Sequence, residues 1–494
     1  MNRVLDELPD AFVSHTAISR DVSRAMKAGK LRKLASRLYT KNLDDDPEDI
    51  VKRNLWGIVA GYFPGALVAD RTALEADPAS DGSVCLVSER GRTTELPGVV
   101  LRPRRGPGSI ASDTPFVNGL YLSSRPRAYL ENLRPSRARG GRVARTLTRT
   151  ELEEHLDRLI RVSGEEAANR LRDEARAVAS ELDMETEAAD LQALIGAMLG
   201  TRESRLDSRV GRSRSRGRAY DPHRLELFHG LHQSLRDRPP TDRPAPHRKA
   251  PGPVTLAFFE AYFSNFVEGT EFLVDEAVQI VFEGAIPRHR PADARDVIGT
   301  WRLVSDREEM SRTPKDFEAL LGLLRERNAK IMAGRPEMRP SEFKERQNRA
   351  GQTIFVAPEL VPGTLEQGFD LYHSLESPFE RAAYMMFLVS EVHPFEDGNG
   401  RVARVMMNAE LVAGGEERIV IPTVFRDDYL AALRALSRTQ RTEPLIRALD
   451  YAQRWTIAVD WASIAETQRQ LEACNAFLDS GEAEIEGKRL HMPR

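Results

Sequence analysis

The chain has 494 residues, 41% of them hydrophobic and 30% charged, and a formal net charge of -3 from 72 basic and 75 acidic residues. At about 100 to 200 residues per domain, this length predicts several folded units and not a single core. The charge balance excludes a polycation of the histone kind.

The two cysteines, Cys85 and Cys474, lack disulfide or metal-ligand spacing. No stretch approaches the ~18 apolar residues of a membrane helix, and the acidic start is unlike a secretory signal. We therefore expect a cytoplasmic protein without a membrane partner.

Residues 1–80 predict a small α/β unit. Apolar residues recur at helical spacing from Ile18 to Met26, Gly29 can end that helix, and residues 31–40 are typical of a strand or ribbon. Helix, glycine and basic ribbon outline a winged helix-turn-helix whose lysines and arginines can contact DNA phosphates. A solvated charged face is the alternative interpretation.

The first 200 residues also resemble part of a known protein family. The pattern of the basic ribbon and of the stretch from Ala66 to Leu74 resembles the N-terminal part of abortive-infection antitoxins, whose winged helix binds promoter DNA. The resemblance implies a winged-helix-like domain over residues 1–80 and an antitoxin-like α/β region over residues 81–204. The helices expected from residue 151 to about residue 199 are explained by core packing.

A strongly basic segment lies within this region. Residues 101–150 contain eleven arginines, no lysine and two acids, which gives 11 - 2 = +9. Nucleic acid is one counter-ion for such a segment, so DNA is a candidate partner of residues 1–150. Pairing of the arginines with acids of neighbouring domains is the equal alternative.

Residues 205–253 are rich in arginine and proline and offer little to bury, which predicts a linker. A helix-rich unit is expected from residue 254 to residue 494. Within it, a capping box at residues 377–380 predicts the start of a helix that ends near His393. A loop with Gly398 and Gly400 then leads into a second helix.

The loop after His393 carries the side chains of a phosphate site. The two glycines let the backbone approach a bulky anion, and the free N–H groups of the second helix point at it. Arg401 and Arg404, three residues apart, can hold further phosphates. Asp397 is a hard carboxylate of the kind that Mg²⁺ takes. His393 titrates near neutrality and can accept the proton of an attacking hydroxyl.

Residues 393–404, His-Pro-Phe-Glu-Asp-Gly-Asn-Gly-Arg-Val-Ala-Arg, match the pattern H-P-F-x-[DE]-G-N-[GK]-R-x-x-R throughout. This stretch resembles the signature of the Fic family. The resemblance implies an all-helical C-terminal fold over residues 254–494 and a protein adenylyltransferase with ATP as substrate. His393 would be the base for a Ser, Thr or Tyr hydroxyl, and Asp397 would hold Mg²⁺. Asn399 and the loop amides would stabilise the transferring group.

Three further features resemble parts of that family. Residues 343–358 resemble a β-hairpin flap that aligns the target's chain by edge pairing, with a plain surface hairpin as the alternative; its candidate residues are Gly351, Thr353 and Phe355. Tyr429 falls where relatives place an aromatic near the adenine. Ser437 falls where many relatives have an asparagine that faces the base.

Ser264, Glu268 and Gly269 fit the inhibitory pattern [ST]-x-x-x-E-[GN] of that family. The spacing of four places Ser264 and Glu268 on one helical face, so the glutamate can reach Arg404 and occupy the space of the γ-phosphate. We expect an inhibitory helix over residues 254–268. The alternative is an amphipathic helix that only packs its aromatic side chains.

The sequence thus predicts a multidomain, mainly α protein that acts as an autoinhibited adenylyltransferase on a target protein and on itself, releasing pyrophosphate. The alternative is a DNA-binding, antitoxin-like regulator whose C-terminal domain senses nucleotide or removes AMP. The oligomeric state and the target are not encoded in any pattern that we recognise.

Overall fold

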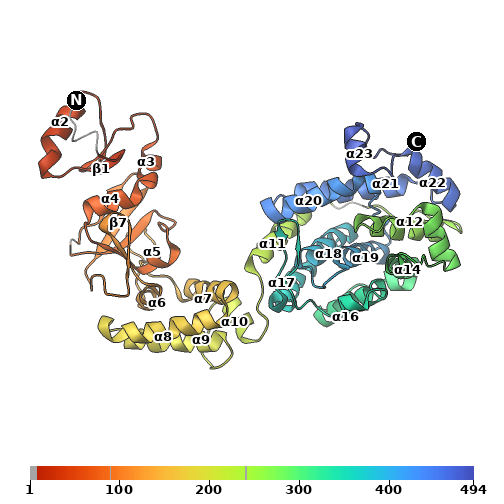
Figure 1. Ribbon diagram of the computed structural model, residues 1–494, viewed down its shortest axis with the longest axis horizontal. Coiled ribbons are helices and arrows are strands. Elements are labelled where there is room, and N and C mark those ends of the chain that lie inside the picture. The colour runs from red at the N-terminus through yellow and green to blue at the C-terminus, as the bar shows by residue number, and fades with distance from the viewer. Residues whose placement is uncertain (1–7, 90, 240–241, 494) are drawn as a thin grey trace. The chain divides into compact units, whose positions relative to one another are not determined.

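The computed structural model describes residues 8–89, 91–239 and 242–493. The chain divides into two compact units between Gly217 and Arg218 (Figure 1). Helices predominate, and the strands are short, which confirms the prediction of a multidomain, mainly α protein. Within the described residues, no helix is both long and apolar enough to cross a lipid bilayer.

The first unit begins with a small three-stranded sheet. Its strands are β1 (Ala11–Val13), β2 (Arg32–Ala35) and β3 (Leu38–Thr40), antiparallel in the order β1-β3-β2. The helix α2 (Ser19–Lys27) precedes β2, and Gly29, with a φ of 67°, lies just after the helix as predicted. Ile18 and Val22 are buried against this sheet. The predicted order of helix, glycine and ribbon is therefore confirmed.

A second, six-stranded sheet follows in the order β6-β7-β5-β4-β9-β8. Its strand β4 (Leu67–Val68) pairs with β5 (Ser83–Val87), so the predicted boundary at residue 80 cuts through one sheet. The two strands are connected through α5 (Asp70–Glu75), which a boundary based on composition does not detect. The remaining strands and helices of this region are β6 (Thr94–Leu96), β7 (Val99–Arg104), β8 (Thr114–Pro115), β9 (Tyr121–Leu122), α3 (Pro47–Arg53), α4 (Leu55–Tyr62) and α6 (Arg125–Leu133).

Part of the basic segment at residues 101–150 is neutralised inside this unit. The carboxylate of Asp70 accepts hydrogen bonds from Arg104 and Arg145 at 2.8 Å each. Glu131, whose side chain is fully buried, pairs with Arg104 and Arg127 at 3.1 Å. For these arginines the pairing alternative is correct, with acids of the same unit as partners, because buried guanidinium groups require carboxylate partners.

The predicted helical region consists of α7 (Arg149–Ser163), α8 (Glu165–Leu182) and α9 (Glu185–Met198). The predicted linker of residues 205–253 is wrong for much of its length. The helix α10 (Arg209–Ser215) belongs to the first unit, and α11 (Pro222–Arg236) packs on α17 (Val361–Tyr372) and α18 (Pro378–Val392) of the second. Apolar residues at helical spacing, with Phe228 fully buried, outweigh the arginines and prolines that surround them.

The second unit is a helical bundle in which α18 and α19 (Asn399–Ala413) pack along each other (Figure 1). The helix α12 (Gly252–Val267) contributes a row of buried aromatics, including Phe258, Phe259 and Phe263. A two-stranded hairpin, β10 (Arg349–Ala350) and β11 (Thr353–Ile354), is added to the bundle. The other helices are α13 (Val274–Val278), α14 (Pro291–Ser305), α15 (Arg307–Met310), α16 (Phe317–Ile331), α20 (Arg426–Thr439), α21 (Glu443–Ala458), α22 (Ile464–Ala473) and α23 (Ser480–Ile485).

Candidate active site

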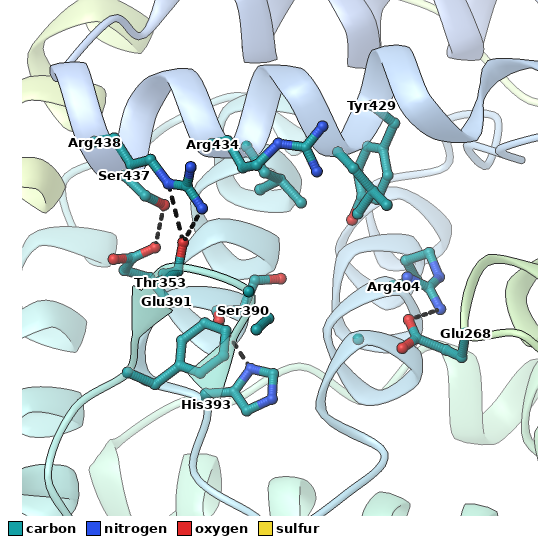
Figure 2. Close-up of a pocket in the computed structure, with 16 residues that line it drawn as sticks. Glu268, Thr353, Ser390, Glu391, His393, Arg404, Tyr429, Arg434, Ser437 and Arg438 are labelled. Carbon is teal, nitrogen blue, oxygen red and sulfur yellow. Dashed lines mark hydrogen bonds and ion pairs between the residues drawn. The ribbon is translucent and has the colours of Figure 1, made fainter. Parts of the chain in front are cut away.

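A pocket of about 390 Å³ opens in the second unit between the hairpin, the α18–α19 loop and α20 (Figure 2). Its volume lies in the range of small-ligand sites, about 300 to 1,000 Å³. Glu268 and Arg404 line one end, His393 lies in the middle, and the side chains of Glu391 and Ser437 lie at the other end. Residues from distant parts of the sequence therefore converge on one cavity.

The loop that forms the pocket floor connects α18 to α19. The helix α18 starts at the predicted capping box, in which the Glu380 amide donates to Ser377 Oγ at 3.2 Å and the Ser377 amide donates to the Glu380 carboxylate at 3.3 Å. It ends at Val392, as predicted, because His393 takes a left-handed conformation with a φ of 54°. A non-glycine residue seldom adopts this conformation, which is typical of residues that the surrounding structure holds for function.

The imidazole of His393 is positioned as a neutral base. Its Nδ1 lies 3.2 Å from the carbonyl oxygen of Ser390, which can only accept, so Nδ1 carries the proton and Nε2 keeps its lone pair. The ring stacks on Phe355, with centroids 3.7 Å apart and planes 7° apart. Burial lowers the pKa of His393 to about 4, and the nearby charge of Lys344 acts in the same direction.

Two glycines of the loop lie where a larger residue would clash with a neighbouring side chain. Gly398, the residue before α19, has a φ of 80°, and a Cβ there would lie 2.8 Å from Met332 Sδ. A Cβ on Gly400 would lie 2.1 Å from the carboxylate oxygen Oε1 of Glu268. The first amides of α19 have no partner within the helix, and with its dipole they favour an anion.

The side chain of Asn399 fixes the loop from within. It is buried, with Oδ1 accepting from the Phe395 amide and Nδ2 donating to the Phe395 carbonyl, both at 2.8 Å. These two bonds hold the loop around the buried Phe395 ring. That Asn399 also stabilises the transferring group stays a prediction.

Arg404 and Glu268 form the ion pair predicted for the inhibitory helix. Arg404 Nη2 donates to Glu268 Oε1 at 2.7 Å, and Nε donates to Ser264 Oγ at 3.0 Å. Gly269, with a φ of 85°, follows directly. Burial alone would raise the pKa of Glu268, but Arg404 holds it below its usual value, so the carboxylate stays ionised.

Arg401 and Arg404 have different surroundings. The guanidinium of Arg401 is buried, 2.7 Å from Asp296 Oδ2 on α14 and 3.6 Å from Asp397 Oδ1. Arg401 lies outside the lining of the pocket, whereas Arg404 lies within it. Arg401 is thus paired with Asp296 in this structure, and phosphate binding by either arginine stays a prediction.

The predicted flap is present as the β10–β11 hairpin, with Gly351 in its turn at a φ of 57°. Thr353 Oγ1 accepts a hydrogen bond from Arg438 Nη2 at 2.9 Å, which ties the hairpin to α20. At the base of the flap, the Lys344 amide donates to the Pro394 carbonyl at 2.9 Å. The hairpin is thus connected to α20, and the base of the flap is connected to the loop.

Tyr429 and Ser437 both line the pocket, but at different ends (Figure 2). They lie eight residues apart on α20, which corresponds to about 12 Å along the helix. Tyr429 is buried near Arg404, and Ser437 Oγ donates to Glu391 Oε2. Both residues line the same cavity, and the contact of each with a nucleobase stays a prediction.

Asp397 is the candidate metal ligand. Its side chain is 42% exposed, and its Oδ1 accepts a hydrogen bond from the Gly398 amide at 2.6 Å. No group of three or more potential metal ligands exists within the described residues. A single hard carboxylate beside an anion site still fits Mg²⁺, which commonly uses one or two carboxylates and completes its shell with water and phosphate oxygens.

Sequence reasoning missed several buried side chains that support the site. Asn328 on α16 donates to the Asp397 carbonyl at 3.0 Å. Lys344 Nζ donates to Asn348 Oδ1 at 2.7 Å, and burial lowers the pKa of Lys344 to about 7. Arg224 pairs with Glu391, and Asp296 pairs with Arg401. Of these residues, only Glu391 could have been noticed in the sequence. It is a charged residue within the apolar stripe of a predicted helix, two positions before the motif.

Comparisons with known proteins point to one family. The model of the Fic/DOC family matches residues 320–411. A Fido domain-containing protein of Dictyostelium discoideum is 35% identical over 101 residues, which cover 19% of this chain and 71% of that protein. The chain therefore belongs to the Fic/DOC family.

Other relatives carry more specific names. The protein adenylyltransferase fic-1 of Caenorhabditis briggsae is 26% identical over 184 residues, and the chain spans only 36% of its length. Among solved structures, a Fic domain-containing signalling protein of Bacteroides thetaiotaomicron is 20% identical, with a TM-score of 0.37 over 49% of this chain and 98% of that one. Fic-1 of Caenorhabditis elegans is 15% identical, with a TM-score of 0.35 over 67% and 89%.

Proposed function

We propose that this chain is an autoinhibited protein adenylyltransferase, which moves AMP from ATP to a Ser, Thr or Tyr hydroxyl of a target protein and of itself. The observation that carries the proposal is the neutral His393, held with Nε2 free beside a glycine-rich anion site in a pocket of nucleotide size. The name protein adenylyltransferase that several relatives bear supports it.

The chemistry follows from the placement of His393. Its Nε2 accepts the proton of the target hydroxyl while the hydroxyl oxygen forms a bond to the α-phosphorus of ATP. The bond between that phosphorus and the oxygen leading to the β-phosphate breaks, and pyrophosphate leaves. Because the pKa of His393 lies near 4, the ring is already deprotonated at neutral pH and ready to accept this proton.

The negative charge of the triphosphate meets three groups of this chain. The first amides of α19 point into the loop, and Arg404 provides a guanidinium at the same end of the pocket. Asp397 would hold Mg²⁺, which when bound neutralises phosphate charge. Ser264 orients Arg404 through its hydroxyl.

We infer that Glu268 inhibits this reaction in the state described. Its carboxylate occupies the space over Gly400 and pairs with Arg404. A γ-phosphate at Arg404 would lie against an ionised carboxylate, and like charges at contact distance repel. Glu268 must therefore move before the triphosphate can be held by Arg404.

The test uses the full chain and ATP labelled at the α-phosphate. We expect label on the protein with Glu268→Gly and no label when His393→Ala is added to it. The two forms differ in the base alone, so equal labelling would contradict the assignment of His393. Circular dichroism of both forms verifies that they are folded.

For the first unit we propose contact with DNA as a second function, resting on its exposed basic residues. The described side chains of α2 and of the ribbon after it include the exposed residues Arg20, Arg24, Lys27, Lys30 and Lys33. Clustered cations that are not neutralised by buried acids suit the phosphates of a duplex. The helix followed by a β-ribbon is consistent with a winged-helix arrangement.

A further inference from the structure

The first unit contains a second pocket, formed by three of its helices. A cavity of about 510 Å³ is lined by residues of α5, α6 and α7, which are labelled in Figure 1. Its volume lies in the range of small-ligand sites, about 300 to 1,000 Å³. All of its lining residues belong to the first unit, so it shares no residue with the pocket at His393.

Helical spacing brings the polar side chains of two helices to this cavity. On α7, His155 and Arg158 lie three residues apart and share one face of the helix. On α6, Arg125 lies one turn before Tyr129. The two guanidinium groups, the phenol and the imidazole can all donate hydrogen bonds to a ligand in the cavity.

The two arginines of the cavity have no acid partner. Within the described ranges, neither Arg125 nor Arg158 forms an ion pair or a hydrogen bond. This distinguishes Arg125 from the arginines of the same basic segment that pair with buried acids. Glu75 also lines the cavity, but its two oxygens accept hydrogen bonds from Arg71 at 2.8 and 2.9 Å. Glu154, one turn before Arg158, is exposed and lies outside the lining. The cavity therefore has an excess of positive charge.

Tyr129 places a buried hydroxyl beside these charges. Only 3% of its surface is exposed, and its ring packs in the hydrophobic core of the unit, which fixes its position. The hydroxyl has no hydrogen-bond partner in the part of the chain that the structure describes. Burial raises the pKa of Tyr129 to about 12, so the phenol keeps its proton at neutral pH. A buried donor without a partner is costly, and an acceptor in the cavity would remove this cost.

The rest of the lining suits the body of a small molecule. Leu159 belongs to the hydrophobic core, and Leu74 packs against it. Val162 lies one turn beyond Arg158 on α7, and 76% of its surface is exposed. An apolar part of a ligand bound at the arginines would cover this side chain, and removing apolar surface from water is favourable.

We propose that this cavity binds a small phosphate monoester with an apolar or ring-shaped body. A phosphate monoester carries a charge of about -1.5 to -2 at neutral pH and three acceptor oxygens. These match the two guanidinium groups of Arg125 and Arg158 and the hydroxyl of Tyr129. A carboxylate, or a phosphodiester of a nucleic-acid backbone, carries a single charge and leaves one guanidinium uncompensated. The inference does not depend on AMP transfer at His393.

The test measures the binding of phenyl phosphate to the full chain by ligand-observed nuclear magnetic resonance titration. Phenyl phosphate combines the phosphate of a monoester with a ring. We expect it to bind at least about tenfold more tightly than dimethyl phosphate, which has the single charge of a nucleic-acid phosphate. Inorganic phosphate, which lacks an apolar body, should also bind more weakly than phenyl phosphate.

Substitutions in the lining locate the binding. Arg158→Gln changes an exposed side chain and should weaken the binding of phenyl phosphate about tenfold, the effect of a lost charge-assisted hydrogen bond. Tyr129→Phe keeps the ring and should weaken it about threefold, because a neutral donor contributes less. Arg170→Gln is the matched control, since it removes an exposed positive charge from α8 of the same unit, outside the cavity. It should leave the affinity unchanged.

Three results would overturn the inference. Equal binding of phenyl phosphate and dimethyl phosphate would show that the site does not recognise a monoester. An affinity that survives Arg158→Gln would place the probe elsewhere, and an equal loss with Arg170→Gln would show attraction by net charge alone. Circular dichroism of each variant verifies that it is folded.

Discussion

At the scale of single residues, the surroundings of His393 differ strongly from those of a free side chain. The Phe355 ring covers one face, the Ser390 carbonyl fixes the tautomer, and the pKa falls to about 4. Fixing the base in its neutral form removes the protonation step that a free histidine would undergo near pH 6.5. The consequence is a measurable pH dependence.

We expect the single-turnover rate of AMP transfer by the Glu268→Gly form to be flat from about pH 5 to pH 7 and to fall only near pH 4, where His393 gains a proton. Phe355→Ala exposes the ring and should move this acidic limb upward, toward about pH 6.5. The pH of half-maximal rate is the measurement. A limb near pH 6.5 before Phe355 is changed would contradict the burial of the base.

The sequence could identify a functional residue when its role depends only on residues close to it in the chain. His393, Gly398, Gly400 and Arg404 all lie in one loop and the first turns of the helix after it, and twelve consecutive positions encode them. Asn399 lies in the same twelve positions, but its bonds to Phe395 depend on how the loop closes. A motif gives the chemical type of a side chain and does not give its partner.

At the scale of secondary structure elements, α12 places Glu268 against the first turn of α19. The carboxylate lies where a Cβ on Gly400 would clash, and its partner Arg404 lies one turn further along α19. The contact joins residues 136 positions apart. We therefore expect the strength of the proposed inhibition to depend on the end of α12 and not on the fold as a whole.

We expect Glu268→Gly to raise self-modification at least about tenfold, because removing the carboxylate frees Arg404 for the γ-phosphate. Labelling with ATP under initial-rate conditions measures the effect. Glu271→Gly, three residues further on, is the matched control, because it removes another carboxylate outside the pocket. An equal rise in both variants would show that loosening the segment, and not loss of the ion pair, causes the activation.

The helix α11 shows that amino-acid composition can predict a linker where the structure has a helix. Its neighbours are rich in arginine and proline, and this composition predicted a linker. The buried side chains of Leu227, Phe228 and Leu231 pack on the bundle, and Phe228 lies 5.9 Å from Phe387, measured between ring centroids. Arg224 on the same helix reaches Glu391, 167 residues away. No local pattern connects these two residues, so their pairing could not be predicted from the sequence.

At the scale of the whole molecule, the chain combines two units of different construction. The first contains an antiparallel sheet, a mixed sheet and a helical region, and the second is the helical bundle that holds the pocket. The motif, the inhibitory helix and the flap, all in the second unit, could be predicted because a known family shares them. The boundary near residue 217 could not, because helices adjoin it on both sides.

Contact of the first unit with DNA is tested with the full chain and a labelled duplex at several salt concentrations. We expect Lys27→Glu to weaken binding and to reduce the slope of log affinity against log salt by about one, the effect of one lost phosphate contact. Arg170→Glu, which reverses an exposed charge on α8 of the same unit, should leave the slope unchanged. Equal effects of both substitutions would indicate attraction by net charge alone.

The central claim is that the pocket transfers AMP and not the terminal phosphate. Full-length protein with Glu268→Gly is incubated in parallel with ATP labelled at the α-phosphate or at the γ-phosphate, and the label retained by the protein is measured. We predict retention of the α-label only, with one pyrophosphate released for each AMP bound. Retention of the γ-label without the α-label would show phosphoryl transfer and would contradict the account.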